Sequence, residues 1–234
     1  MKNGNQKCVA VILAAGIGSR MNSSTTKQSL SILGKSVLRR TLEAFEHSSE
    51  VDGIIIVSRT EELEFAREEA EALLKVKRIV TGGQTRAESA KKGFLAAKGE
   101  YDFIMIHDAA RCLITSEKID AVAKAAYQYG AASASHPMTD SVKLVEEGLI
   151  LKDIARNTLV AVQTPQAFSM NIYESALARA SSLGSEITDD NSLVESIGVK
   201  VYAIDTGKDN IKITEPCDLE FVEFIISKRE KRKE

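Results

Sequence analysis

The segment Cys8-Val9-Ala10-Val11-Ile12-Leu13 runs directly into Ala14-Ala15-Gly16-Ile17-Gly18-Ser19-Arg20-Met21, and this junction decides the fold. The first six residues are all apolar, as expected for a strand that is buried on both faces of a parallel sheet. A loop of small residues follows the strand at its carboxyl end, where doubly wound sheets bind ligands. Small residues let backbone N–H groups approach phosphate oxygens, and Arg20 and Lys27 follow closely. We therefore predict a phosphate-binding loop, with a ligand-free tight turn as the alternative.

Two common nucleotide-binding fingerprints are interrupted near this loop. A dinucleotide fingerprint needs a third small residue where Met21 stands, which weakens the hypothesis of an NAD-dependent oxidoreductase. The tripeptide Gly34-Lys35-Ser36 resembles the end of a P-loop, but the first glycine of that motif would fall at Ser29. The loop therefore matches neither of these two fingerprints.

Strand and helix patterns alternate along the chain, which predicts an α/β fold with a mostly parallel sheet flanked by helices. The further predicted strands are Gly53–Val57, Arg78–Thr81, Phe103–Ile106, Leu159–Val162 and Val199–Ile204. One predicted helix begins after Ser36, a second runs from Thr60 to Leu74, and a third ends near Ala97. The later predicted helices are Ser116–Tyr129, Ser169–Leu183, Asp189–Ile197 and a last one that begins at Pro216.

A β-hairpin interrupts this order. Ser141–Val145 and Leu149–Ile154 flank a Glu-Glu-Gly turn at 146–148. Because an isolated hairpin is marginally stable in water, it must pack on its own domain or on another subunit. We find no linker rich in proline, glycine or serine, so we predict one domain over residues 1–234 with a projecting arm at 139–160.

The composition is that of an ordinary globular protein. The 234 residues include 31 lysines and arginines against 33 aspartates and glutamates, and this net charge of −2 argues against a nucleic-acid binder. The longest apolar stretch, Cys8 to Ala15, is far shorter than the ~20 residues of a membrane span, and no signal peptide is evident. Three widely spaced cysteines predict neither zinc nor a disulfide framework. We expect a cytoplasmic protein.

Two later segments carry further charged residues at strand ends. Asp108 follows a predicted strand and could hold Mg²⁺, with Arg111 suited to a phosphate; a surface ion pair is the alternative. We interpret His107 as a partly buried histidine with satisfied hydrogen bonds rather than a general base. Lys212 alternates with Ile211 and Ile213, so it faces either a site or water.

Together these segments predict a polyanion site with one metal. It would contain four cations, Arg20, Lys27, Arg111 and Lys212, and one carboxylate, Asp108. The chain has only three histidines, and phosphoryl-type transfer needs no proton carrier if the attacking group is already an anion. The composition of the site therefore fits attack by a phosphate on a nucleoside triphosphate.

An ordered series of motifs spans nearly the whole chain. The motifs are AAGIGSRM (14–21), Lys27-Gln28, GGQTRAES (82–89), HDAAR (107–111), Asp140-Ser141-Val142-Lys143, QTPQAF (163–168), Thr188-Asp189-Asp190 and NIKIT (210–214). This series resembles the methylerythritol-phosphate cytidylyltransferases of the non-mevalonate isoprenoid pathway. The resemblance implies a Rossmann-like fold and a homodimer in which the 139–160 arm crosses the interface.

The resemblance also implies roles for individual residues. Arg20 and Lys27 would neutralise the triphosphate, and Arg156 and Lys212 would position the acceptor phosphate. Asp108 would bind the metal and the acceptor. The nucleotide pocket would comprise Ala14, Ala15, Gly16, Gly18, Gly82, Gly83, Ser89 and Ala109. The acceptor pocket would add Arg111, Ser141 and Thr188, with Ser141 and Arg156 supplied by the neighbouring subunit.

The implied reaction joins CTP and 2-C-methyl-D-erythritol 4-phosphate, with Mg²⁺, and releases pyrophosphate. Three positions depart from the family pattern near the site: Thr26 and Cys112 stand where prolines are usual, and Ser29 replaces an aromatic or leucine-like residue. Ser141 stands for the usual threonine and Ala87 for the usual glutamine, and no charged group of the proposed chemistry is lost. A ribitol-5-phosphate (pentitol-phosphate) cytidylyltransferase and a non-catalytic nucleotide-binding homologue remain the alternatives.

Overall fold

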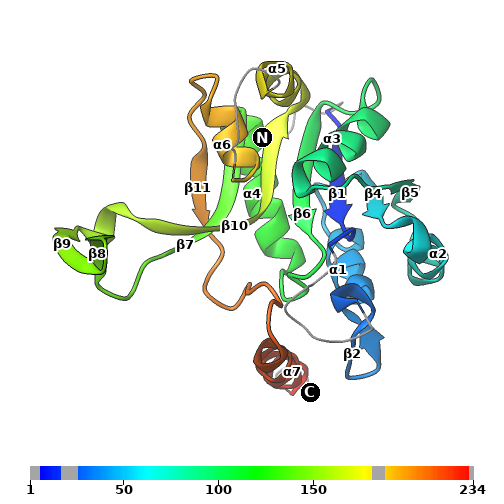
Figure 1. The fold of residues 1–234 in the computed structure, drawn as a ribbon. Helices are drawn as coiled ribbons and strands as arrows, with labels where there is room; N and C mark the ends of the chain where they lie inside the picture. Colours follow the sequence, from blue (N-terminus) through cyan, green and yellow to red (C-terminus); the bar gives the residue numbers. More distant parts are fainter. Residues whose placement is uncertain (1–5, 17–25, 181–187, 232–234) are drawn as a thin grey trace.

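A seven-stranded sheet forms the centre of the structure, a computed structural model that describes residues 6–16, 26–180 and 188–231 (Figure 1). In spatial order its strands are β11 (Tyr202–Asp205), β7 (Ala131–Pro137), β10 (Val160–Ser169), β6 (Phe103–Asp108), β1 (Cys8–Leu13), β4 (Gly53–Ser58) and β5 (Val76–Thr81). β10 runs antiparallel to both β6 and β7, and the other neighbouring strands pair in parallel. The predicted mostly parallel α/β fold is confirmed.

Helices cover both faces of this sheet. α1 (Val37–Glu46), α2 (Leu63–Ala70) and α4 (Ser116–Tyr129) pack on one face, and α3 (Arg86–Ala97), α5 (Met170–Ala180) and α6 (Asp190–Glu195) pack on the other. Alternate residues of β1 belong to the two hydrophobic cores, because successive side chains of a strand point to opposite faces: Cys8, Ala10 and Ile12 to the first, Val9, Val11 and Leu13 to the second. This double burial explains the uninterrupted apolar run.

A third, smaller core lies beside the carboxyl ends of the strands. It is formed by the β2–β3 hairpin (Ser31–Ile32 and Lys35–Ser36), by the last helix, α7 (Pro216–Glu230), and by residues such as Cys112 and Ile213. Short 3-10 helices complete the described elements: η2 (Lys27–Ser29), η3 (Thr60–Glu62) and η4 (Arg156–Thr158). α7 therefore packs against the segments that carry the charged residues predicted for the site.

One close contact sets how near α3 lies to β1. A Cβ atom on Gly93 would lie 2.3 Å from Cγ1 of Val11, so a larger residue would push the helix away from the sheet. Ser89, in the same buried face of α3, and Arg86, its first residue, are consequently held at the carboxyl edge of the sheet.

Two strand predictions are wrong. β7 is not among the predicted strands, because its sequence AASASHP lacks the bulky β-branched and aromatic residues that mark a strand. β10 continues to Ser169, seven residues beyond the predicted end at Val162. Its central part, Gln163–Gln166, is polar but buried, and the ladder to β7 shifts register between Val162 and Gln166.

Element ends also differ from the predictions. α2 ends at Ala70 instead of Leu74, because Glu71 is extended and Ala72 adopts a positive φ of 64°. β11 begins at Tyr202 rather than Val199, and α6 spans Asp190–Glu195 within the predicted Asp189–Ile197. α5 begins one residue after the predicted Ser169, and the predicted end at Leu183 lies outside the described residues.

The predicted hairpin is present and projects from the side of the sheet (Figure 1). β8 (Val142–Glu146) and β9 (Leu149–Ile154) pair antiparallel through a turn in which Glu147 and Gly148 have positive φ. Apolar side chains on it are largely exposed, including Leu149 at 68% and Ile150 at 69%. Apolar surface of this kind marks an interaction site. Within the described part of the chain, no helix combines the length and apolar character needed to span a bilayer.

Candidate active site

A pocket of about 420 Å³ opens at the carboxyl ends of β1 and β6. Since β1, β4 and β6 are parallel, their carboxyl ends meet at one edge of the sheet, where such folds bind ligands. Its lining residues are Leu13, Ala15, Gly16, Lys27, Gln28, Arg59, Gly83, Gln84, Thr85, Arg86, Ser89, Asp108, Ala110 and Lys212.

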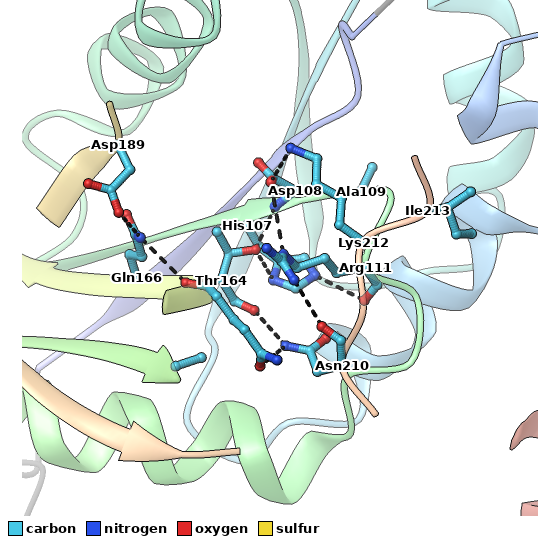
Figure 2. A network of polar contacts seen from close by, with 12 residues as sticks. His107, Asp108, Ala109, Arg111, Thr164, Gln166, Asp189, Asn210, Lys212 and Ile213 are labelled. Carbon is cyan, nitrogen blue, oxygen red and sulfur yellow. Dashed lines mark hydrogen bonds and ion pairs between the residues drawn. The ribbon is translucent and has the colours of Figure 1, made fainter. Parts of the chain in front are cut away.

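Asp108 lies at the centre of the charged residues (Figure 2). Lys212 Nζ donates to its Oδ2 at 2.8 Å, and Arg86 Nε donates to its Oδ1 at 3.1 Å. Arg111 Nε lies 4.0 Å from Oδ2. Burial alone would raise the pKa of this carboxyl, but the positive charges of Arg86 and Lys212 hold the pKa well below its usual range. Asp108 is therefore a carboxylate at every pH at which the enzyme would work.

Lys27 lies in the same pocket. Its side chain is buried, and its Nζ donates to the carbonyl oxygens of Thr214 at 2.9 Å and Ile213 at 3.2 Å. These carbonyls follow Lys212 directly in the chain, so Lys27 and Lys212 are brought to one place by a single segment. Arg20 and Gly18 lie outside the described residues.

Arg111 lies beside the pocket rather than in its wall. Its Nη1 donates to the carbonyl oxygen of Asn210 at 2.9 Å. Burial lowers the pKa of the guanidinium more than the neighbouring Asp108 raises it. The Asn210 amide in turn donates to Oε1 of Gln163 and to the carbonyl of Thr164 (Figure 2). These hydrogen bonds attach the Lys212 segment to β10.

His107 is hydrogen-bonded, as predicted, but it is completely buried rather than partly buried. Its Nδ1 lies 3.1 Å from Oγ1 of Thr164, and Oγ1 also accepts the backbone N–H of Asp108 at 3.1 Å. Burial lowers the pKa of His107 to about 3, more than the Asp108 charge raises it. A neutral buried imidazole orients its neighbours and takes up no proton near pH 7.

We predict a measurable pH dependence of stability from His107. The pKa of its imidazole falls from 6.5 to about 3 on folding. Between these values the unfolded chain binds the additional proton, so the free energy of unfolding should rise as the pH rises, by up to about 1.4 kcal/mol per pH unit, and this contribution should be lost as the pH falls from about 6.5 towards 3. Urea unfolding between about pH 4 and pH 6.5 should show a shallower slope for His107→Gln. An unchanged slope would contradict the buried neutral imidazole.

The small residues predicted for the nucleotide pocket divide into three groups. Ala15, Gly16, Gly83 and Ser89 line the pocket. Gly82 lines an adjoining open hollow that shares Ala15 and Gly83 with it. Ala14 and Ala109 are buried behind the wall. A Cβ atom added to Gly82 would lie 2.7 Å from the Cβ of Ala15, and one added to Gly83 would lie 2.3 Å from the Cβ of Glu88. This turn therefore excludes side chains at both positions.

Three predicted acceptor residues lie apart from the pocket. Ser141 and Arg156 are exposed on the arm, and Arg156 Nη1 donates to the carbonyl of Thr139 at 2.7 Å. Thr188 is exposed before α6, with its Oγ1 2.9 Å from Oγ of Ser192. The described chain does not bring Ser141 or Arg156 to its own pocket, so their supply by a neighbouring subunit stays a prediction.

The family model for 2-C-methyl-D-erythritol 4-phosphate cytidylyltransferase matches residues 8–228. The chain belongs to this family. It is 40% identical to the enzyme of that name from Pelotomaculum thermopropionicum, with 97% of each chain covered. It is 39% identical to the Geobacter metallireducens enzyme, with 94% of this chain and 97% of the relative covered.

Solved structures of cytidylyltransferases share the fold. The 4-diphosphocytidyl-2C-methyl-D-erythritol synthase of Anaerococcus prevotii superposes with a TM-score of 0.86 at 25% identity, covering 95% of this chain and 96% of that one. The 2-C-methyl-D-erythritol 4-phosphate cytidylyltransferase of Thermus thermophilus superposes with a TM-score of 0.77 at 27% identity, covering 94% and 98%. The chain is accordingly a nucleotidyltransferase with the expected Rossmann-like architecture.

The positions that depart from the cytidylyltransferase pattern have local partners. Thr26 and Ser29 lie at either end of one turn, where Ser29 Oγ donates to the Thr26 carbonyl at 3.0 Å and lies 3.2 Å from Thr26 Oγ1. Cys112 is buried in the third core, and burial raises the pKa of its thiol to about 11. The two replacements at Lys27 thus form a contact with each other, and Cys112 serves as a small apolar residue.

Several residues of this cytidylyltransferase pocket were not predicted from the sequence. Arg86 contacts Asp108, and Gln28 Nε2 donates to the Gly16 carbonyl at 3.2 Å. Arg59, Gln84 and Thr85 also line the pocket. For Arg59, Gln84 and Thr85, the position after β4 or β5, at the same sheet edge as Asp108, is the signal that could have identified them.

The donor set of the pocket fits a magnesium ion that is held mainly by substrate. Asp108 is the one acidic residue in the described lining, and the residues described contain no cluster of three or more potential metal ligands. Mg²⁺ typically takes one or two carboxylates and completes its shell with phosphate oxygens and water. Asp108 could therefore supply one ligand to an ion that arrives with a triphosphate.

Proposed function

We propose that this chain transfers a cytidylyl group from CTP to 2-C-methyl-D-erythritol 4-phosphate. A phosphate oxygen of the acceptor attacks the α-phosphorus of CTP, a new P–O bond forms, and the bond to pyrophosphate breaks. The supporting observation is the convergence of Lys27, Arg86 and Lys212 with one carboxylate, Asp108, at the pocket. The attacking phosphate is already an anion, so positioning and neutralisation of charge suffice for the reaction.

Different residues have different roles in this reaction. Lys27 and Arg20 neutralise charge that develops on the triphosphate, and Lys212 and Arg156 hold the acceptor phosphate in line. The glycine turn at Gly82 and Gly83 admits the nucleotide close to the backbone. Asp108 would supply a ligand to Mg²⁺ and would accept hydrogen bonds from the acceptor hydroxyls. Bound Mg²⁺ would supply charge neutralisation on the phosphates.

A coupled pyrophosphate assay tests this function. Purified protein should release pyrophosphate from CTP with 2-C-methyl-D-erythritol 4-phosphate and Mg²⁺, and much less from ATP or UTP. Parallel reactions with ribitol 5-phosphate test the alternative acceptor. Faster turnover with ribitol 5-phosphate would reassign the acceptor, and nucleotide binding without pyrophosphate release would support a non-catalytic homologue.

We also propose a homodimer in the cytoplasm. Exposed apolar residues on the arm, including Leu149, Ile150 and Leu151, support pairing with a second copy. The three cysteines form no disulfide, which suits a reducing compartment. In the dimer, Ser141 and Arg156 of one chain would complete the acceptor pocket of its partner.

Mixed dimers test this arrangement. Lys27→Ala chains and Arg156→Ala chains should each be nearly inactive alone. If Arg156 acts in the neighbouring subunit, random mixing of the two should restore about a quarter of the wild-type sites, because half the dimers are mixed and each carries one intact site. Activity measured after the chains are mixed under mild denaturation and refolded checks the prediction. No gain on mixing would show that each chain uses its own Arg156.

A further inference from the structure

Asp190 is a buried carboxylate for which the proposed chemistry has no use. It is 3% exposed, and its Oδ1 accepts the Tyr173 hydroxyl at 2.6 Å. Its backbone N–H donates to Oε1 of Gln166 at 3.1 Å. Its Oδ2 accepts Nη1 of Arg86 at 2.6 Å. A buried charge must be paired, and Arg86 is its cationic partner among the described residues.

Arg86 joins this buried carboxylate to the one in the pocket. Through Nη1 it bonds to Asp190, and through Nε it bonds to Asp108 Oδ1 at 3.1 Å. The planar guanidinium suits such a bridge, because its donors are fixed relative to one another. Apart from Arg86, Asp190 is held by the Tyr173 hydroxyl and by Gln166, so the position of Arg86 is set from behind the pocket.

Lys212 holds the other oxygen of Asp108 in a different way. Its ammonium is 2.8 Å from Oδ2, but its side chain is 42% exposed and sits on a segment without regular secondary structure. A lysine is a point charge on a flexible stem and can move between partners. Arg111 does not replace it, because its Nε lies 4.0 Å away and its Nη1 donates to Asn210.

We propose that Arg86, oriented by Asp190, is a positioning residue. It keeps the Asp108 carboxylate in place when the ammonium of Lys212 leaves Asp108 and binds the acceptor phosphate. This inference rests on the proposed function, in which Lys212 binds that phosphate. When Lys212 turns to the phosphate, Arg86 keeps Asp108 neutralised and in place. Without Arg86, Asp108 would compete with the phosphate for the ammonium of Lys212.

Steady-state kinetics of four variants test the proposal. Arg86→Gln should lower kcat/KM for the acceptor by about 10²-fold, and Asp190→Asn by about tenfold, while the KM for CTP stays within about threefold of wild type. Because Asp190 acts through Arg86, the double variant should be no worse than Arg86→Gln alone. Arg86→Lys, which cannot bridge both carboxylates, should recover only part of the loss. Multiplicative effects in the double variant, or wild-type activity of Arg86→Lys, would overturn the proposal.

A further variant and a control distinguish a positioning role from a general loss of structure. Tyr173→Phe removes only the hydroxyl that bonds to Asp190, and should give a smaller loss of the same kind, about threefold, without a change in the KM for CTP. Arg78→Gln is the matched control: Arg78 bonds to Glu100 and to the Ala96 carbonyl of α3, outside the pocket. Its activity should equal that of wild type. If Arg78→Gln lost as much activity as the Arg86 and Asp190 variants, the losses would be explained by altered packing of α3.

A spectroscopic measurement distinguishes failure of this inference from failure of the proposed function. The Nε–H proton of Arg86, bonded to Asp108, should give a slowly exchanging NMR signal in wild-type protein. Asp190→Asn should remove or broaden that signal. If the wild type turned over neither acceptor, the proposed function would fail while this signal still reported the bridge. A signal that Asp190→Asn leaves unchanged would overturn the role of Asp190.

Discussion

Replacing Lys27 with alanine should lower kcat for pyrophosphate release from CTP by about 10²–10³-fold, which corresponds to ~2.7–4 kcal/mol of transition-state stabilisation. Lys27 is buried, lines the pocket and is held by the carbonyls of Ile213 and Thr214. Its charge is therefore already in place before substrate binds. A preorganised charge in a site with little water stabilises a developing negative charge far better than the same charge in solvent.

The measurement is a coupled pyrophosphate assay at saturating CTP and acceptor. Lys35→Ala is a suitable control, because Lys35 is half-exposed and pairs with Glu43 on the surface. It should retain wild-type activity. Thermal unfolding of both variants checks that the loss does not arise from the carbonyls left without a donor. Lys27→Ala activity within tenfold of wild type would remove Lys27 from the proposed mechanism.

Replacing Asp108 with asparagine should lower kcat/KM by about 10³-fold, or ~4 kcal/mol. The change removes the one carboxylate in the described pocket lining and the partner shared by Arg86 and Lys212. The concentration of Mg²⁺ at half-maximal activity should rise, because the ion would retain only phosphate and water ligands. The melting temperature of the substrate-free variant should also fall, since the partly buried guanidinium groups of Arg86 and Arg111 lose their counter-charge.

Magnesium titrations of activity and thermal unfolding of the apo protein measure these effects. Asp205→Asn provides the comparison: Asp205 is exposed at the end of β11 and accepts the backbone N–H of Gly207. It should change neither the magnesium requirement nor turnover. If Asp108→Asn kept an unaltered magnesium requirement, Asp108 could not be the ligand for the ion.

Strands with bulky apolar residues were predictable from sequence because they are buried on both faces. Cys8–Leu13 and Gly53–Val57 are of this kind. β7 was not predictable from the sequence. Alanine and serine lie along it where α4 packs closely on the sheet, and such small residues do not indicate a strand. Gln163–Gln166 in β10 was not predicted as strand, because its polar side chains find buried partners, such as Asn210 and Asp189, that are distant in sequence.

The charged residues of the site were partly predictable for the same reason. Asp108 and Lys27 stand next to predicted strands or loops at one sheet edge, and the pocket contains both. Lys212 was ambiguous, because alternation with isoleucines also suits a surface strand. Arg86 could not be assigned from the sequence, since a charged residue at a helix start is usually solvated, and its two carboxylate partners are 22 and 104 residues away.

The last helix packs in the third core and determines where the segment with Lys212 lies. Asp218 accepts the backbone N–H and hydroxyl of Thr214, and Arg229 bonds to Asp209 and to the Leu113 carbonyl. Both ends of the 209–214 segment are thus anchored to α7. Turnover consequently depends on the carboxyl end of the chain: shortening it, or tethering it to a tag that bends the helix, would misalign the reactive lysines in a molecule that still folds.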